Sequence, residues 1–128
     1  MEKIGIIDLG SNSARLVVVD LFTDGHFMVI DELKESVRLG QDMDRDGFLK
    51  PQRVTETIKT LKMLKRLCDA HGVARIISVA TAAVRRAKNQ RSFLDEIQAT
   101  CNIKLRVLSE EEEATLVYRG VINSMDIP

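Results

Sequence analysis

The first third of the chain contains two apolar runs that a short polar stretch separates. Ile4–Ile7 form the first run and Leu16–Val19 form the second, and both are rich in β-branched residues. Such runs on either side of a Gly/Ser/Asn break predict two strands, over about 3–9 and 14–22, that are joined by a tight hairpin. A turn signal and a further apolar stretch predict a third strand over about 26–37. The chain is therefore predicted to open with an antiparallel meander.

A long helical pattern follows the meander. Apolar residues recur every three to four positions from Pro51, which suits the first position of a helix, and Gly72 suits the left-handed position just after its end. These signals predict a helix over 51–71. The polar, acidic stretch 41–50 before it is predicted to be a solvated loop.

The remaining residues alternate between strand and helix patterns. A short apolar run predicts a strand over 74–80, and Asn89 is placed to cap a further helix that ends at Asn102. A last strand is predicted over 103–108, and a final helix runs from Ser109 to about residue 124. Because a helix separates the third strand from the fourth, the fourth strand should be parallel to its neighbour. The pattern predicts an α/β fold with a mixed five-stranded sheet, in the order βββαβα(α)βα.

Length and composition narrow the class of protein. The chain has 128 residues, which predicts one domain over 1–128, and 45% of them are hydrophobic, enough for a substantial core. Nineteen acidic and nineteen basic residues give no net charge, which argues against a nucleic-acid or membrane-surface binder. The aromatic content of 4% argues against a base-stacking surface.

Cysteine usage and the beginning of the chain point to a cellular compartment. Cys68 and Cys101 are far apart and have no spacing typical of a zinc site, so we expect two buried thiols in a reducing environment. No signal peptide or membrane-spanning run is recognisable. We therefore expect a soluble, cytoplasmic protein with no membrane partner.

Three polar segments follow predicted strands, and they are the candidates for chemistry. In open α/β sheets ligands bind where parallel strands end, and 8–13, 81–86 and 109–113 all lie at such exits. In the first, Gly10 lets the backbone approach a ligand, and Ser11, Asn12 and Ser13 supply hydroxyl, amide and backbone donors. Asp8 could hold a hydrated divalent cation. The alternative is an ordinary hairpin turn.

The other two segments each contain one notable charge. Ser109 and Glu112 have the spacing of a capping box, which explains the start of the glutamate run but not Glu113. Glu113 falls on an apolar helix face, where a carboxylate in a half-buried cleft suits a general base; the alternative is that it reaches solvent. Arg85 could contact phosphate oxygens. Alternatively, it could form an ion pair with a glutamate of the run Glu110–Glu113.

Together, these segments resemble the exopolyphosphatase/guanosine-pentaphosphate phosphatase (Ppx/GppA) family. The matching stretches are Asp8–Ser13 with Leu16, Ala80–Arg85 with Ala87 and Asn89, and Ser109–Ala114 with Tyr118, Gly120 and Val121. The family belongs to the actin-like, sugar-kinase and heat-shock-70 ATPase superfamily. The resemblance implies a ribonuclease H-like lobe. Glu110 departs from the glycine that many relatives have, which puts the detailed shape of that turn in doubt.

The resemblance also implies a reaction, namely hydrolysis of a terminal phosphoanhydride bond in inorganic polyphosphate or in pppGpp. Glu113 would activate the attacking water, residues 10–13 would bind phosphate together with Arg85, and Asp8 would help to position Mg²⁺.

The family's second lobe, with its own glycine-rich phosphate loop, has no counterpart in this sequence. We therefore expect a first lobe that is inactive by itself, with exposed apolar surface that could favour a homodimer. Two other readings stay open: a non-catalytic module that binds phosphate-rich ligands or partners, and a kinase lobe of the same superfamily.

Overall fold

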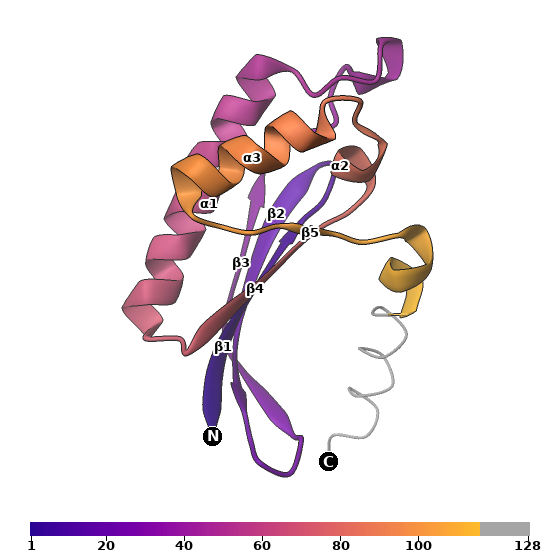
Figure 1. Cartoon of the computed structure of the whole chain (residues 1–128). Helices are drawn as coiled ribbons and strands as arrows, with labels where there is room; N and C mark the ends of the chain where they lie inside the picture. The colour runs from indigo at the N-terminus through magenta and orange to yellow at the C-terminus, as the bar shows by residue number, and fades with distance from the viewer. Residues whose placement is uncertain (116–128) are drawn as a thin grey trace.

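A five-stranded mixed sheet forms the centre of the molecule (Figure 1). The computed structural model describes residues 1–115. Strands β1 (Glu2–Leu9), β2 (Ser13–Leu21) and β3 (Phe27–Ser36) form the antiparallel meander, whereas β4 (Arg75–Ala80) runs parallel to β1 and β5 (Arg106–Val107) runs parallel to β4. The sheet order is β3-β2-β1-β4-β5, so β1 lies at its centre. The predicted α/β fold and mixed sheet are confirmed.

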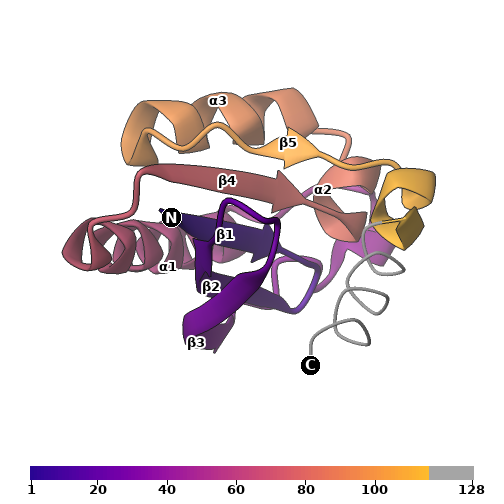
Figure 2. The same ribbon diagram turned by 90° about the horizontal axis from the view of Figure 1, so that it is seen from below.

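The two long helices pack on the same face of this sheet, as Figures 1 and 2 show. Helix α1 (Pro51–His71) contacts β2, and α3 (Gln90–Cys101) packs beside α1. The short helix α2 (Ala82–Arg86) follows β4 directly, and a 3-10 turn, η1 (Met43–Arg45), precedes α1. Among residues 1–115, no helix is long and apolar enough to cross a membrane.

The core lies between the sheet and the two long helices. Alternate residues of β1 and β2 point into it, such as Ile7 and its cross-strand partner Leu16, and both are buried. Gly5 lets α1 come close to the sheet, because a Cβ on Gly5 would lie 2.7 Å from Cys68 Sγ. The opposite strand positions, which include Asp8 and Arg15, face away from α1 and α3.

Several boundaries match the sequence pattern, and others differ from it. Helix α1 has the predicted bounds, and Gly72 has the expected left-handed backbone. The last strand is shorter than predicted, and the optional second helix between β4 and β5 is present, because the short α2 precedes α3. The helix that begins at residue 110 is described only as far as residue 115, so its predicted end lies outside the described residues.

The stretch 41–50 was predicted to be a solvated loop, and this prediction is wrong in part. Met43 and Leu49 are 3% and 2% exposed and belong to the core. Asn89 stands at the start of α3 but makes no side-chain cap. It instead accepts a hydrogen bond from Leu49 N at 2.9 Å and donates one to Leu49 O at 3.1 Å. This long-range contact accompanies the burial of the loop, and the local pattern does not contain it.

Candidate functional site

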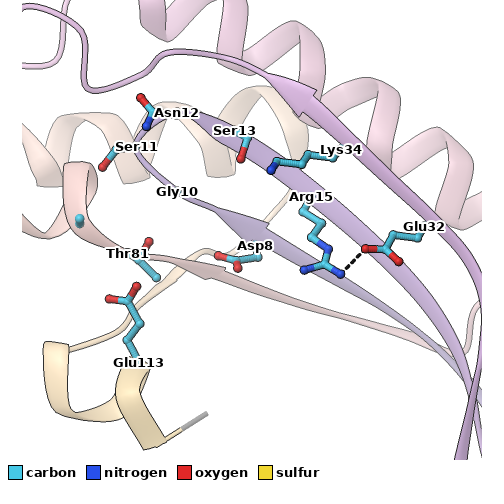
Figure 3. A pocket seen from close by; sticks show the side chains of 11 residues that line it. Asp8, Gly10, Ser11, Asn12, Ser13, Arg15, Glu32, Lys34, Thr81 and Glu113 are labelled. Carbon is cyan, nitrogen blue, oxygen red and sulfur yellow. Dashed lines mark hydrogen bonds and ion pairs between the residues drawn. The ribbon is translucent and has the colours of Figure 1, made fainter. Parts of the chain in front are cut away.

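A cleft of about 620 Å³ opens where β1 and β4 end (Figure 3). Backbone pairing brings the two strand ends together, because Leu9 lies opposite Ala80 and Thr81 N donates to Leu9 O at 3.0 Å. The residues that line the cleft come from four strand ends and from the helical turn after β5: Asp8, Gly10, Ser11, Asn12, Ser13, Arg15, Glu32, Lys34, Thr81, Ala82 and Glu113. All three polar segments predicted from the sequence therefore meet at one edge of the sheet.

The hairpin loop, residues 10–13, is held from one side by the segment 37–40. Backbone N–H groups of that segment donate to the carbonyl oxygens of Ser11 and Asn12, over N–O distances of 2.9 and 3.0 Å. Since the N–H and C=O groups of a trans peptide point in opposite directions, the Asn12 N–H points away from that segment. Within residues 1–115, no acceptor receives the backbone N–H of Ser11 or of Asn12. The loop can therefore offer two backbone donors to an anion.

Gly10 is not required by the packing of the loop. Its N–H closes the turn on Ser13 O at 2.9 Å, and its φ is not positive. A Cβ added at Gly10 would meet its nearest protein atoms, Ser13 O and Thr81 Oγ1, at 3.5 and 3.9 Å, which are ordinary contact distances. The missing side chain instead keeps the wall of the cleft open, as a backbone that approaches a ligand closely requires.

Glu113 is positioned by the start of its helix. The Glu112 N–H donates to Ser109 Oγ at 3.0 Å, and the Ser109 N–H donates to Glu112 Oε1 at 3.1 Å. This is the predicted capping box, and it is confirmed. It fixes the first helical turn, and Figure 3 shows that the next residue, Glu113, turns its carboxylate toward the cleft.

Arg85 contacts the carboxylate of Glu113. Its Nη1 donates to Glu113 Oε2 at 3.1 Å and to Leu108 O at 2.9 Å. The ion pair with the glutamate run, which was the alternative for Arg85, is thus present. Arg85 is not among the residues that line the cleft. Its predicted contact with phosphate stays a prediction.

Asp8 and Glu113 give the cleft a concentration of negative charge. The pKa of Asp8 is raised, first because the surrounding atoms desolvate its carboxylate and second because Glu113 is nearby, while Arg15 acts in the opposite direction. Arg15 itself forms an ion pair with Glu32, as Figure 3 shows, so its charge is shared. Two carboxylates that face one cleft favour a cation between them and an anionic ligand.

The oxygen atoms of the cleft could supply part of a Mg²⁺ coordination shell, and phosphate oxygens and water would supply the rest. Among residues 1–115, no group of three or more His, Cys, Asp or Glu side chains could hold a metal ion. Mg²⁺ is commonly bound through one or two carboxylates, with water and phosphate oxygens completing its octahedral shell. Asp8, whose pKa is raised first by desolvation and second by the nearby Glu113, fits the role of such a single protein ligand.

Six of the seven residues predicted for the site line this cleft: Asp8, Gly10, Ser11, Asn12, Ser13 and Glu113. Five others also line it: Thr81 and Ala82 belong to the candidate segment 81–86 but were not predicted individually, and Arg15, Glu32 and Lys34 were not predicted at all. Arg15 pairs with Asp8 across the hairpin, and Lys34 pairs with Arg15 across the next ladder. The alternation of side chains along β2 and β3 was the signal that could have found Arg15 and Lys34.

Comparisons with known proteins identify relatives over most of the chain. Residues 18–128 match the model of the Ppx/GppA phosphatase family. Exopolyphosphatase 1 of Mycobacterium tuberculosis is 29% identical over 119 residues, which are 93% of this chain and 35% of that protein. The bifunctional 3-dehydroquinate synthase/phosphatase of Fusobacterium nucleatum is 32% identical over 126 residues, which are 94% of this chain and 19% of that protein.

Two solved structures share the fold closely. The Ppx/GppA family member of Aquifex aeolicus has a TM-score of 0.90 and 34% identity, with 98% of this chain and 41% of that chain covered. An exopolyphosphatase of Cytophaga hutchinsonii has a TM-score of 0.88 and 32% identity, with 94% and 38% covered. The chain thus spans about two fifths of these structures or less. Because the family match, the identities and the fold agree, this chain belongs to the Ppx/GppA phosphatase family.

Proposed function

We propose that this chain forms the first lobe of an enzyme that hydrolyses the terminal phosphoanhydride bond of inorganic polyphosphate or of pppGpp. The observation that carries the proposal is the arrangement of Glu113 and the hairpin loop around one cleft. A carboxylate and a set of unpaired backbone donors are the two groups that such a reaction needs. The family membership and the exopolyphosphatase relatives support the same chemistry.

In the proposed reaction, the oxygen of a water molecule attacks the terminal phosphorus. Glu113 accepts the proton of that water as the new P–O bond forms. The bond to the bridging oxygen breaks, and its electron pair stays on the shortened chain, which leaves with an added negative charge. Orthophosphate is the second product. Arg85 orients the Glu113 carboxylate through their hydrogen bond of 3.1 Å.

The hairpin loop binds the charge of the terminal phosphate. The backbone N–H groups of Ser11 and Asn12 and the hydroxyl of Ser13 can donate to its oxygens. Asp8 would hold Mg²⁺, which when bound neutralises part of the phosphate charge. Thr81, which is 8% exposed and follows β4, adds a hydroxyl to the wall between the loop and Glu113.

A second lobe would supply the opposite wall of the cleft. The chain corresponds to only 35–41% of the length of relatives such as Exopolyphosphatase 1 and the Aquifex aeolicus protein. The cleft described above is open, and its donors all come from one side. We therefore expect the 128-residue chain alone to release phosphate at no more than the background rate.

The test restores a second lobe. The chain is fused to the parts of the Aquifex aeolicus family member that it does not cover, and phosphate release from polyphosphate and from pppGpp is measured with Mg²⁺. Glu113→Gln should lower kcat by about 100-fold or more, as loss of a general base does. Glu111→Gln is the matched control, because Glu111 is exposed in the same glutamate run and does not line the cleft. Equal rates for the Glu113→Gln variant and the unaltered fusion would contradict the proposal.

A further inference from the structure

A second pocket lies on the outer side of the hairpin loop. Its volume is about 570 Å³, and it shares Ser11 and Asn12 with the cleft. The side chains of these two residues lie at the end of the loop away from Asp8 in Figure 3. The remaining lining residues are Ser36, Arg38, Gly40, Gln41 and Arg86. This lining contains two positive charges and no negative one.

The two guanidinium groups of this pocket belong to exposed arginines that can donate to an anion. Within residues 1–43 and 45–115, neither Arg38 nor Arg86 takes part in an ion pair, whereas Arg15, Arg75 and Arg106 each pair with a glutamate. An unpaired arginine presents a fork of donors that matches phosphate oxygens. Two such groups in one hollow make a site for a multiply charged anion.

Backbone hydrogen bonds tie the segment of Arg38 to two residues that also line the cleft. The Arg38 N–H donates to Asn12 O at 3.0 Å, and the Gly40 N–H donates to Ser11 O at 2.9 Å. Gly40 allows this close approach, because a Cβ there would lie 3.3 Å from Ser11 Cβ. Arg86 follows Arg85 in α2. These hydrogen bonds therefore hold the outer pocket at a fixed position beside the hairpin loop.

The positive surface continues beyond the outer pocket. Arg86 also lines a neighbouring hollow of about 370 Å³, together with Arg45 and Lys88. The one carboxylate that lines this hollow, Asp46, is already paired with Lys50 at 2.6 Å. Positively charged side chains thus extend from the hairpin loop, through Arg86, to Lys88.

We propose that Arg38 and Arg86 bind the non-reacting phosphates of a linear inorganic polyphosphate whose terminal phosphate lies in the cleft. This inference rests on the proposed function and names the substrate class. The chain of phosphates leaves the cleft over Ser11 and Asn12 and continues along the positive path. The linings of both hollows lack an aromatic side chain on which a base could stack, which favours polyphosphate over a nucleotide as the occupant.

The test measures binding by the 128-residue chain. Kd values are determined by calorimetry for long-chain polyphosphate and for tripolyphosphate, with wild type, Arg38→Gln, Arg86→Gln and the double variant. The double variant should bind long-chain polyphosphate about tenfold more weakly, the size expected for lost charge-assisted hydrogen bonds. Its affinity for tripolyphosphate, which fits within the cleft, should stay within about twofold of wild type.

Arg66→Gln is the matched control. It removes one arginine charge from an exposed position near the end of α1, far along the chain from the hairpin loop. It should leave both affinities unchanged. Thermal unfolding of each variant shows that the fold is kept.

Four results would overturn the inference: no measurable binding of long-chain polyphosphate by wild type, a loss below about threefold in the double variant, an equal loss for both ligands, or an equal loss in Arg66→Gln. The proposed function fails separately, through unchanged phosphate release in Glu113→Gln. Unchanged binding in the double variant together with Glu113-dependent hydrolysis would therefore reject the outer pocket alone.

Discussion

Arg85 Nη1 holds two acceptors at once, Glu113 Oε2 at 3.1 Å and the carbonyl oxygen of Leu108 at 2.9 Å. The side chains of Arg85 and Glu113 are 20% and 39% exposed, so the pair is partly shielded from water. The second bond fixes the guanidinium to the end of β5. One arginine thereby ties the carboxylate to the sheet and limits the directions in which it can point.

Arg85→Gln should therefore lower kcat more than it raises KM. A misplaced general base can cost about 100-fold in rate, and loss of the pair lets Glu113 move. Arg85→Gln should have little further effect when Glu113→Gln is already present, since both changes then affect the same step. Steady-state kinetics of the two-lobed fusion check this. Arg106→Gln, which breaks the neighbouring pair with Glu112, is the control and should leave kcat near wild type. A rise in KM with kcat unchanged would instead assign Arg85 to phosphate binding.

Asp8→Asn should stabilise the chain at neutral pH. Desolvation and Glu113 raise the pKa of Asp8 above its ordinary value of 3.8, so the charged form is disfavoured in the folded state. That penalty is fully present above the raised pKa and disappears below 3.8. The thermal midpoint of Asp8→Asn should exceed that of wild type at pH 7, and the difference should shrink as the pH falls.

Asp24→Asn provides a control of opposite sign. Hydrogen bonds from the backbone and side chain of His26 lower the pKa of Asp24, so its charged form is favoured in the folded state. That variant should be slightly less stable than wild type at neutral pH, and its deficit should also vanish in acid. A pH-independent difference in either variant would contradict the electrostatic explanation.

Gly5→Ala should destabilise the core. The new methyl group would lie 2.7 Å from Cys68 Sγ, so the sheet and α1 would have to separate locally. Overpacking of this kind costs about 1–3 kcal/mol, measured by urea unfolding. Cys68→Ala should recover part of that loss in the Gly5→Ala background. Cys101→Ala, at a buried cysteine that does not meet the Gly5 position, should give no recovery.

Ser109→Ala should loosen the turn that carries Glu113. The change removes the acceptor for the Glu112 N–H, and loss of a cap costs about 1 kcal/mol. Amide hydrogen exchange at Glu112 should become faster, and kcat of the two-lobed fusion should fall. Ser109→Asp keeps a capping oxygen and should retain most of the protection. Unchanged exchange in Ser109→Ala would show that the cap does not hold this turn.

Asn89→Ala should destabilise the chain although Asn89 is only half-buried. The change removes both hydrogen bonds to the backbone of Leu49, and unpaired groups of this kind cost about 1–3 kcal/mol. Asn89→Asp should not restore the stability, because a carboxylate cannot donate to the Leu49 carbonyl oxygen. Denaturant unfolding measures both effects. Full stability in Asn89→Asp would show that the donated bond contributes nothing.

Local signals carried most of what could be predicted of the fold. Pro51 and Gly72 delimit α1 because their backbone preferences do not depend on distant residues, and the Ser109–Glu112 box is contained within four residues. The convergence of Asp8 and Glu113 on one cleft followed from the rule that ligands gather at the ends of parallel strands. These predictions required only local sequence and the order of the strands and helices. They did not require knowledge of which side chains touch.

Features that depend on register or on long-range packing could not be predicted in this way. Arg15 and Lys34 reach the cleft because of the ladders that pair them, and the local pattern shows neither ladder. Met43 and Leu49 are buried in the core, and Asn89, forty residues after Leu49, binds the Leu49 backbone. For Arg85 the sequence left two partners open, phosphate and the glutamate run, and which glutamate it meets depends on how the turn after β5 folds back.

The hydrogen bond from Leu108 N to Ala80 O, at 2.9 Å, anchors the turn of Glu113 to the same strand end that carries Thr81. Glu113 and the hairpin loop are consequently attached to the ends of neighbouring strands of one sheet. In the proposed two-lobed enzyme, the lobes would separate to release product and admit the next substrate. Glu113 and the hairpin loop would keep their positions relative to each other. Under the proposed function, each turnover would then begin with Glu113 already in place beside the hairpin loop.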